Sequence, residues 1–197
     1  MIVYFMVKRI LLLMTLVFSA LFFALSAPVN AQQKLVAAQS DISFVSKQMG
    51  VPVEGKFKKF EADLNFDPKK PDTSKIAFAV DLSSVDIGNS ETEKELTKSG
   101  WFDSLKIPQA KFTSTSIKSV GGGKFEVAGK LAIKGNTRDV TAPISLTQAG
   151  GVTTARGEFT VKRLEFKIGD GDWNDTSLVA NEVVVKVKLT IIGMGAL

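Results

Sequence analysis

The stretch that decides the fold is GGGKFEVAGKLAIKGNTRDVTAPISL, residues 121–146. Apolar side chains alternate with polar or small ones in two runs, and Gly135-Asn136 lies between them. Successive side chains of a strand point to opposite faces of a sheet, so each run predicts a strand with one buried face. Gly and Asn tolerate the positive φ of tight turns, which indicates a β-hairpin. A hairpin cannot bury its apolar face alone, so other strands must cover it.

The same alternation recurs along the chain, and about eight strands are expected. They are predicted at residues 41–46, 53–67, 76–83, 109–117, 125–133, 140–146, 155–162 and 182–192. The buried parity changes near Lys58-Lys59, which predicts a β-bulge that bends the second strand. No helix alternates regularly with the strands, so the sheet is expected to be antiparallel.

One segment, residues 89–100, departs from the β pattern. Ser90-Glu91-Thr92-Glu93 fits a capping box, and Gly100 fits a helix end, so one short helix is predicted, with a structured loop as the alternative. The acids there are expected on an exposed helix face. The fold class is therefore all-β: an eight-stranded antiparallel β-barrel with one short helical excursion, favoured over a sandwich by the predicted bulge. A barrel of this size either fills with side chains or holds one small ligand.

The N-terminal segment, residues 1–31, has the composition of a secretory signal peptide. Lys8 and Arg9 precede an apolar run, and Val29-Asn30-Ala31 offers a small-residue cleavage site. The apolar run is shorter than the roughly 20 residues that span a bilayer, which argues against an uncleaved anchor. The sequence therefore predicts export to the periplasm and a folded domain over residues 32–197. Met1 and Met6 both fit as the first residue of the leader.

The composition excludes several function classes. The 197 residues include no cysteine and no histidine, and the formal net charge is +5. Without cysteine no disulfide forms, so the core must hold the exported domain together. Without histidine there is no imidazole base and no Ser-His or Cys-His nucleophile, and zinc, copper and haem sites are not expected. The net positive charge is too small to indicate nucleic-acid binding, and no cluster of basic residues interleaved with aromatic residues occurs in the sequence.

The acidic loop at residues 170–175 resembles the start of a calcium loop, with oxygen ligands at its first, third and fifth positions. However, Asp175 stands at the sixth position, where glycine is needed, and Asn181 stands where glutamate is needed. A solvated turn is therefore favoured, and no metal, cofactor or catalytic residue is predicted.

Phenylalanine is the unusual residue, with 14 in the chain. Most of those beyond the leader fall on the apolar faces of strands, which fits either an ordinary core or an aromatic-lined tube for an apolar ligand. Small residues on the same faces, such as Gly55, Gly129 and Gly157, are expected to leave space among the rings. The predicted ligand-binding residues are Phe44, Phe57, Phe60, Phe66, Phe78, Val80, Leu82, Trp101, Phe102, Phe112, Leu131 and Phe159.

Trp101-Phe102 is an aromatic pair that follows the predicted helix and precedes Pro108. Loops at barrel ends gate the interior, and two large rings are costly to leave in water. The pair is therefore predicted to close one end of the barrel and to touch the ligand tail. A structural plug without ligand contact is the alternative.

Several short motifs, in this order and spacing, resemble the YceI-like family of exported lipid-binding proteins. The motifs are Ser40–Phe44, Met49–Val51, Gly55–Phe57, Leu64–Pro68, Val80–Asp86, Trp101–Asp103, Pro108–Phe112 and Val127–Gly135. The resemblance implies an extended lipocalin-like barrel with an isoprenoid chain inside. Gln48-Met49-Gly50 and Lys94-Glu95-Leu96 depart from the family pattern, so no head-group site is carried over. Trp101 stands where the family has the first of two phenylalanines.

The leading hypothesis is periplasmic binding, transport or storage of a long apolar isoprenoid lipid, either a polyisoprenoid or an isoprenoid quinone. Burial of the tail would drive binding, at roughly 0.8 kcal/mol per CH₂. A lipid- or radical-modifying enzyme is the alternative, although every inward position assigned from the sequence is apolar or small. An accessory protein to a membrane redox partner is a third hypothesis. The sequence leaves open a transient contact with the membrane or a membrane protein, and a homodimer.

Overall fold

The computed structural model describes residues 32–197, which form one compact unit, Gln32–Leu197. The predicted signal peptide, with cleavage after Ala31, lies outside the described residues. Within the described unit, no helix has both the length and the apolar character needed to cross a membrane.

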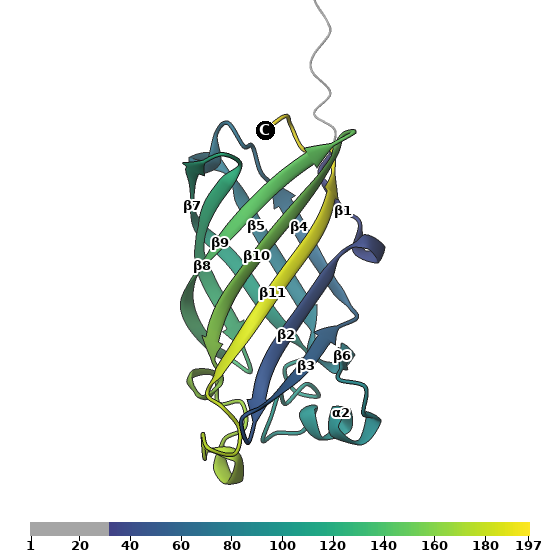
Figure 1. Ribbon diagram of the computed structural model, residues 1–197, viewed down its shortest axis with the longest axis vertical. Helices are drawn as coiled ribbons and strands as arrows, with labels where there is room; N and C mark the ends of the chain where they lie inside the picture. Colours follow the sequence, from purple (N-terminus) through teal and green to yellow (C-terminus); the bar gives the residue numbers. More distant parts are fainter. Residues whose placement is uncertain (1–31) are drawn as a thin grey trace, which may run out of the picture. The chain divides into compact units, whose positions relative to one another are not determined.

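The unit is a curled antiparallel sheet of eleven strands (Figure 1). Nine are long: β2 (Asp41–Gln48), β3 (Val51–Phe57), β4 (Phe60–Asn65), β5 (Lys75–Asp81), β7 (Gln109–Gly121), β8 (Lys124–Ile133), β9 (Asn136–Ala149), β10 (Val152–Lys162) and β11 (Glu182–Ile192). Two have two residues each: β1 (Lys34–Leu35) and β6 (Val85–Asp86). The strand order is β4-β5-β7-β8-β9-β10-β11-β2-β3-β6, and β1 pairs with the end of β11.

The described chain also contains short helices. The α-helix is α2 (Ser90–Leu96), and the 3₁₀ turns are η2 (Ala37–Gln39), η3 (Pro71–Thr73), η4 (Leu82–Ser84), η5 (Arg163–Phe166) and η6 (Gly171–Trp173). The helix lies inside the predicted segment but starts from a different cap. The side chain of Asn89, rather than Ser90, accepts hydrogen bonds from the amides of Glu91 and Thr92. Asn89 is extended, as an N-cap residue must be, and Ser90 is already helical.

The predicted hairpin over residues 121–146 is confirmed as β8 and β9. Its turn residues are Lys134-Gly135 rather than Gly135-Asn136, because Ile133 pairs directly with Asn136. Lys134 and Gly135 both have positive φ, 49° and 74°. A two-residue turn of this kind matches the right-handed twist of the strands that it joins. Asn136 is the first residue of β9, and its side-chain amide Nδ2 donates to the Lys134 carbonyl at 2.9 Å.

The strand predicted over residues 53–67 is two strands, and this corrects both the strand count and the predicted bulge. β3 pairs with β2, and β4 pairs with β5, near opposite ends of the strand order. Between them, the Lys58 amide donates to the Ser84 carbonyl at 3.1 Å, and the Lys59 amide donates to Ser84 Oγ at 3.0 Å. The buried residues change from odd to even numbers near Lys58-Lys59 because the chain passes there from one edge of the curled sheet to the other.

Two contacts join the edges of the sheet and complete the barrel. At one end β6, which follows β5 in the chain through η4, pairs with β3 through Phe57 and Val85 and so links the β4–β5 edge to the β3 edge. At the other end the Gln33 side chain bonds Phe66 in both directions: its amide donates to the Phe66 carbonyl, and its Oε1 accepts from the Phe66 amide at 3.1 Å. An antiparallel barrel of the predicted fold class is thus confirmed, with more strands than the eight expected.

Candidate binding cavity

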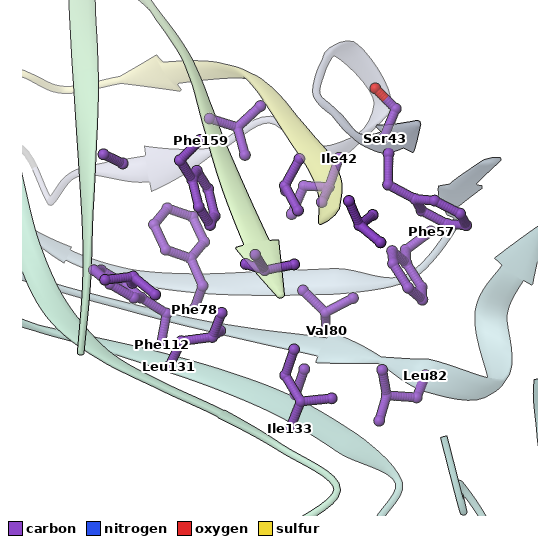
Figure 2. Close-up of a pocket in the computed structure, with 18 of the residues that line it drawn as sticks. Ile42, Ser43, Phe57, Phe78, Val80, Leu82, Phe112, Leu131, Ile133 and Phe159 are labelled. Carbon is purple, nitrogen blue, oxygen red and sulfur yellow. The ribbon is translucent and has the colours of Figure 1, made fainter. Parts of the chain in front are cut away.

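A cavity of about 670 Å³ lies inside the barrel, and inward-facing side chains of most strands line it. Figure 2 shows Ile42, Phe57, Phe78 and Phe159 directed toward this space from different strands. The alternation read from the sequence explains the lining, because every second residue of each strand faces inward. The wall is mostly aliphatic and aromatic.

Eleven of the twelve predicted ligand-binding residues line this cavity. The structure brings together Phe44, Phe57, Phe66, Phe78, Val80, Leu82, Trp101, Phe102, Phe112, Leu131 and Phe159. Phe60 is the exception: it packs against the larger hydrophobic cluster without lining the cavity. Phe60 is the first residue of β4, directly after the break at Lys58-Lys59.

The glycines of the wall do not leave the open space expected among the rings. A Cβ at Gly55 would lie 2.3 Å from Cζ of Phe44, and one at Gly129 would lie 2.5 Å from Cζ of Phe112. At Gly157 the Cδ1 atom of Ile144 occupies the corresponding place. Neighbouring side chains therefore lie over the glycine backbone, and the cavity runs between the packed side chains.

One end of the cavity is closed by apolar side chains that are all less than 10% exposed. They are Phe66, Phe125, Leu146, Ile191 and Met194. The rings of Phe66 and Phe125 meet edge to face with centroids 5.2 Å apart. This end lies away from α2, where the β7–β8 and β9–β10 turns are found (Figure 1). We call these five residues the closed end.

The other end of the cavity, beside α2, is polar and open. Its lining includes Gln48, Asn89, Glu91, Thr92 and Glu95, and all of these except the half-buried Glu95 are exposed. Glu91 and Glu95 are four residues apart and so share one helix face. These acids were predicted on an exposed helix face, and their position at the cavity entrance was not predicted. We call these five residues the mouth.

The pair Trp101-Phe102 lies in the cavity wall near the mouth. The Trp101 ring packs against Trp173 with centroids 5.6 Å apart, and the Phe102 ring packs against Phe57 at 5.9 Å. The indole N–H of Trp101 is buried and has no hydrogen-bond partner. The location at one end of the barrel agrees with the prediction, whereas contact with a ligand tail stays a prediction.

Arg163 is the residue that sequence analysis missed, and it organises the loops behind the mouth. It is 2% exposed, and its guanidinium donates to five backbone carbonyls. The acceptors are Ala180 at 3.1 Å, Ile168 at 2.9 Å, Gly169 at 2.7 Å, Trp173 at 2.6 Å and Val179 at 2.7 Å. Burial lowers the pKa of this guanidinium. All five N–H groups are used, so none remains to bind an anionic ligand.

The alternation of β10 carried one signal, because residue 163 has the same parity as the inward-facing Phe159 and Val161. The predicted strand ended at Lys162, so Arg163 was left unassigned. Its partners are backbone carbonyls, which carry no sequence signature. Arg163 is therefore a charged lining residue beyond the inward positions that were assigned from the sequence.

The acidic loop that resembled a calcium site is held by local bonds. Asp170 Oδ1 lies 3.3 Å from Nζ of Lys134. Asp175 accepts from the Ser177 hydroxyl and, at 2.8 Å, from the Ser177 amide, and these bonds lower the pKa of the Asp175 carboxyl. Within residues 32–197 no three acidic side chains gather in a geometry that could hold a metal ion.

Comparison with known proteins gives consistent matches. The family model described as YceI-like domain matches residues 33–191. Protein YceI of Escherichia coli O157:H7 is 31% identical over 141 residues, covering 70% of this chain and 73% of that protein.

Solved structures match as well. Burkholderia cenocepacia BcnA is similar with a TM-score of 0.77 and 42% identity, covering 80% of this chain and 99% of that one. A domain from Saccharophagus degradans, described as polyisoprenoid binding and implicated in plant cell wall breakdown, has a TM-score of 0.64 at 15% identity and covers 82% of this chain and 98% of its own. This last match concerns the fold alone.

Proposed function

The chain belongs to the YceI-like domain family, and from that membership and the cavity we propose that it binds a long apolar isoprenoid lipid inside its barrel. The observation that carries the proposal is the asymmetric cavity: an apolar wall, a closed end and one polar mouth. A lipid with an apolar tail and a polar head fits such a cavity with the tail inward and the head at the mouth.

Burial of apolar area would supply the binding free energy. Each CH₂ removed from water contributes roughly 0.8 kcal/mol, so a long tail binds tightly with few polar contacts. The cavity volume of about 670 Å³ lies within the range of about 300–1,000 Å³ typical of small-molecule sites.

The charges near the cavity favour a lipid with an uncharged head. Arg163 is the single cation among the described lining residues, and five carbonyls already occupy its donors. Glu91 and Glu95 line the mouth, and Glu95 pairs with Lys98. A phosphate or carboxylate head at the mouth would therefore meet the like charge of Glu91. A quinone, phenol or alcohol head avoids this repulsion.

A binding role is favoured over a catalytic one by the placement of the charged groups. Among the described residues, Glu91, Glu95 and Arg163 are the charged side chains that line the cavity, and both acids lie at the mouth. A deep carboxylate or lysine, which an enzyme acting inside the barrel would need, is missing from this lining. The structural relative described as polyisoprenoid binding is in keeping with this role. A periplasmic carrier or store is the finer form of the proposal, and it rests on the predicted leader.

Native mass spectrometry of protein purified from its own host tests the proposal, with a bound isoprenoid expected. Ala142→Phe, which places a ring inside the cavity, should reduce lipid retention strongly. Thr141→Phe, on the outer face of the same strand, is the matched control and should retain lipid like the wild type. Protein that is always lipid-free and does not take up an isoprenoid after delipidation would exclude the proposed function.

A further inference from the structure

Large apolar side chains stand exposed beside the mouth. Met49, Val51, Trp173 and Leu178, which we call the rim, are 69%, 63%, 36% and 41% exposed. Met49 lies in the β2–β3 turn and Val51 begins β3, whereas Trp173 ends η6 and Leu178 lies between η6 and β11. Both segments lie at the same end of the barrel as α2 (Figure 1). Apolar residues gathered at one functional opening, rather than scattered singly, indicate a surface that meets a partner.

Hydrogen bonds hold the rim in place. The Met49 amide donates to the Leu178 carbonyl at 2.8 Å, and Gln48 forms a β-bridge with Val179. Arg163 binds the carbonyls of both Trp173 and Val179. The turn and the loop therefore form one built surface, and the exposure of the rim does not come from a frayed segment.

The rim is continuous with the cavity. Trp173 lines the cavity and is also part of the rim, and it packs against Trp101 in the cavity wall. Gln48 and Val179, the two residues of the β-bridge, line the cavity as well. Trp173 and Val179 thus connect the rim to the apolar wall of the cavity.

We propose that the rim is a membrane-docking surface, which enters the apolar layer of a bilayer so that lipid passes between the bilayer and the cavity. Tryptophan prefers the bilayer interface, and apolar side chains around it supply the insertion free energy. Four side chains are far fewer than the roughly 20–30 residues that each partner of a stable protein–protein interface contributes. Insertion into a bilayer does not require an interface of that size.

The charges near the rim determine which bilayer it accepts. The loop that carries Trp173 also carries three acids, Asp170, Asp172 and Asp175, and one lysine, Lys167. Lys134 pairs with Asp170, and Lys47 is the basic residue on β2, so the acids and lysines balance and leave no positive excess. Anionic head groups would therefore not attract this surface. Docking should be driven by apolar insertion and should occur on zwitterionic vesicles.

Co-sedimentation of the purified protein with phosphatidylcholine vesicles tests the proposal. Met49→Ser together with Leu178→Ser should weaken vesicle binding by about tenfold for each side chain removed. Val120→Ser together with Val152→Ser is the matched control, because these residues are 65% and 37% exposed at the other end of the barrel. The control should bind like the wild type.

A second readout reports insertion directly. In a Trp101→Phe background Trp173 is the remaining tryptophan, and its emission should shift to the blue and be quenched by brominated lipids. Replacing about one third of the phosphatidylcholine by phosphatidylglycerol should not strengthen binding.

Three outcomes would overturn the docking proposal: no vesicle binding, equal losses in the rim and control variants, or binding that requires phosphatidylglycerol. A rim variant that changes the size of the protein in the absence of vesicles would assign the surface to a second copy instead. Lipid retention is measured separately by mass spectrometry. Failure of docking with retention intact therefore leaves the proposed function standing.

Discussion

The two ends of the barrel differ in the residues and the secondary structure that form them. The closed end consists of apolar side chains from β8, β9 and β11 and from the segments that follow β4 and β11, and its five residues are buried together. The mouth consists of the end of β2 and a short helix capped by Asn89, and the loops behind it are held by hydrogen bonds from Arg163. We therefore expect the closed end to contribute most of the stability of the barrel and the mouth to admit the ligand.

The largest expected effect tests the closed end. Phe125→Ala removes a ring that is 4% exposed and breaks the edge-to-face pair with Phe66. Because the site is closely packed, the free energy of unfolding should fall by about 3–5 kcal/mol. Urea unfolding of the delipidated protein measures this, with Val120→Ala as an exposed control. A loss below about 1 kcal/mol would show that this end does not carry the stability.

The next effect tests the loops behind the mouth. Arg163→Met keeps the stem of the side chain but leaves five carbonyls without their donor, at a cost of about 1–3 kcal/mol for each that stays buried. Since loop carbonyls can turn toward water, we expect a total loss of about 3 kcal/mol. Hydrogen exchange should rise first in residues 163–181, while the strands at the closed end stay protected.

Arg156→Met, on the outer face of β10, is the control and should change neither quantity. Uniform loss of protection over the whole barrel in Arg163→Met would contradict the separation between the two ends.

A smaller effect concerns lipid retention near the mouth. Trp101→Ala together with Phe102→Ala removes two rings from the cavity wall, and retention of an isoprenoid should fall by about 30-fold, or about 2 kcal/mol. The strand signal in circular dichroism should persist, because the pair lies outside the strands. If the double variant unfolds, or keeps its lipid unchanged, these residues belong to the core and do not gate the cavity.

Much of the fold was predictable because alternation is a local signal. Residues 121–146 showed the first strand and the turn to within one residue, whereas β9 is longer at both ends than the predicted 140–146. The parity change near Lys58-Lys59 was also visible, yet it was taken for a bulge. Whether a parity change bends one strand or ends it depends on which strands meet there, and that pairing is not local in sequence.

The candidate site was predictable on its apolar side only. Inward phenylalanines follow from strand parity, and eleven of the twelve predicted residues line the cavity. The polar residues of the mouth and Arg163 were not found, because their roles depend on which backbone groups the fold brings near them. Asn89 is an example, because the neighbouring Ser90 was an equally good N-cap by residue type and only the fold decides between them.

The smallest expected effect is a pH dependence at the seam near the mouth, where β6 pairs with β3. Lys58 Nζ lies 3.1 Å from Asp86 Oδ2, and this bond, with a further one from the Gly88 amide, lowers the pKa of the Asp86 carboxyl below 3.8. A carboxyl whose folded pKa is depressed stabilises the fold above its unfolded pKa, and that contribution is lost as the pH falls through the folded pKa.

Below about pH 4, therefore, hydrogen exchange at the β3–β6 seam should rise before exchange at the closed end, whose side chains are apolar. In Asp86→Asn, hydrogen exchange at the β3–β6 seam should already be fast at neutral pH, and it should not increase further below about pH 4. Asp139→Asn removes an ion pair with Lys130, at 2.7 Å on the outer wall between β8 and β9, and should leave the seam unchanged. If acid loosens the closed end as early as the seam, the ion pair does not distinguish the two ends.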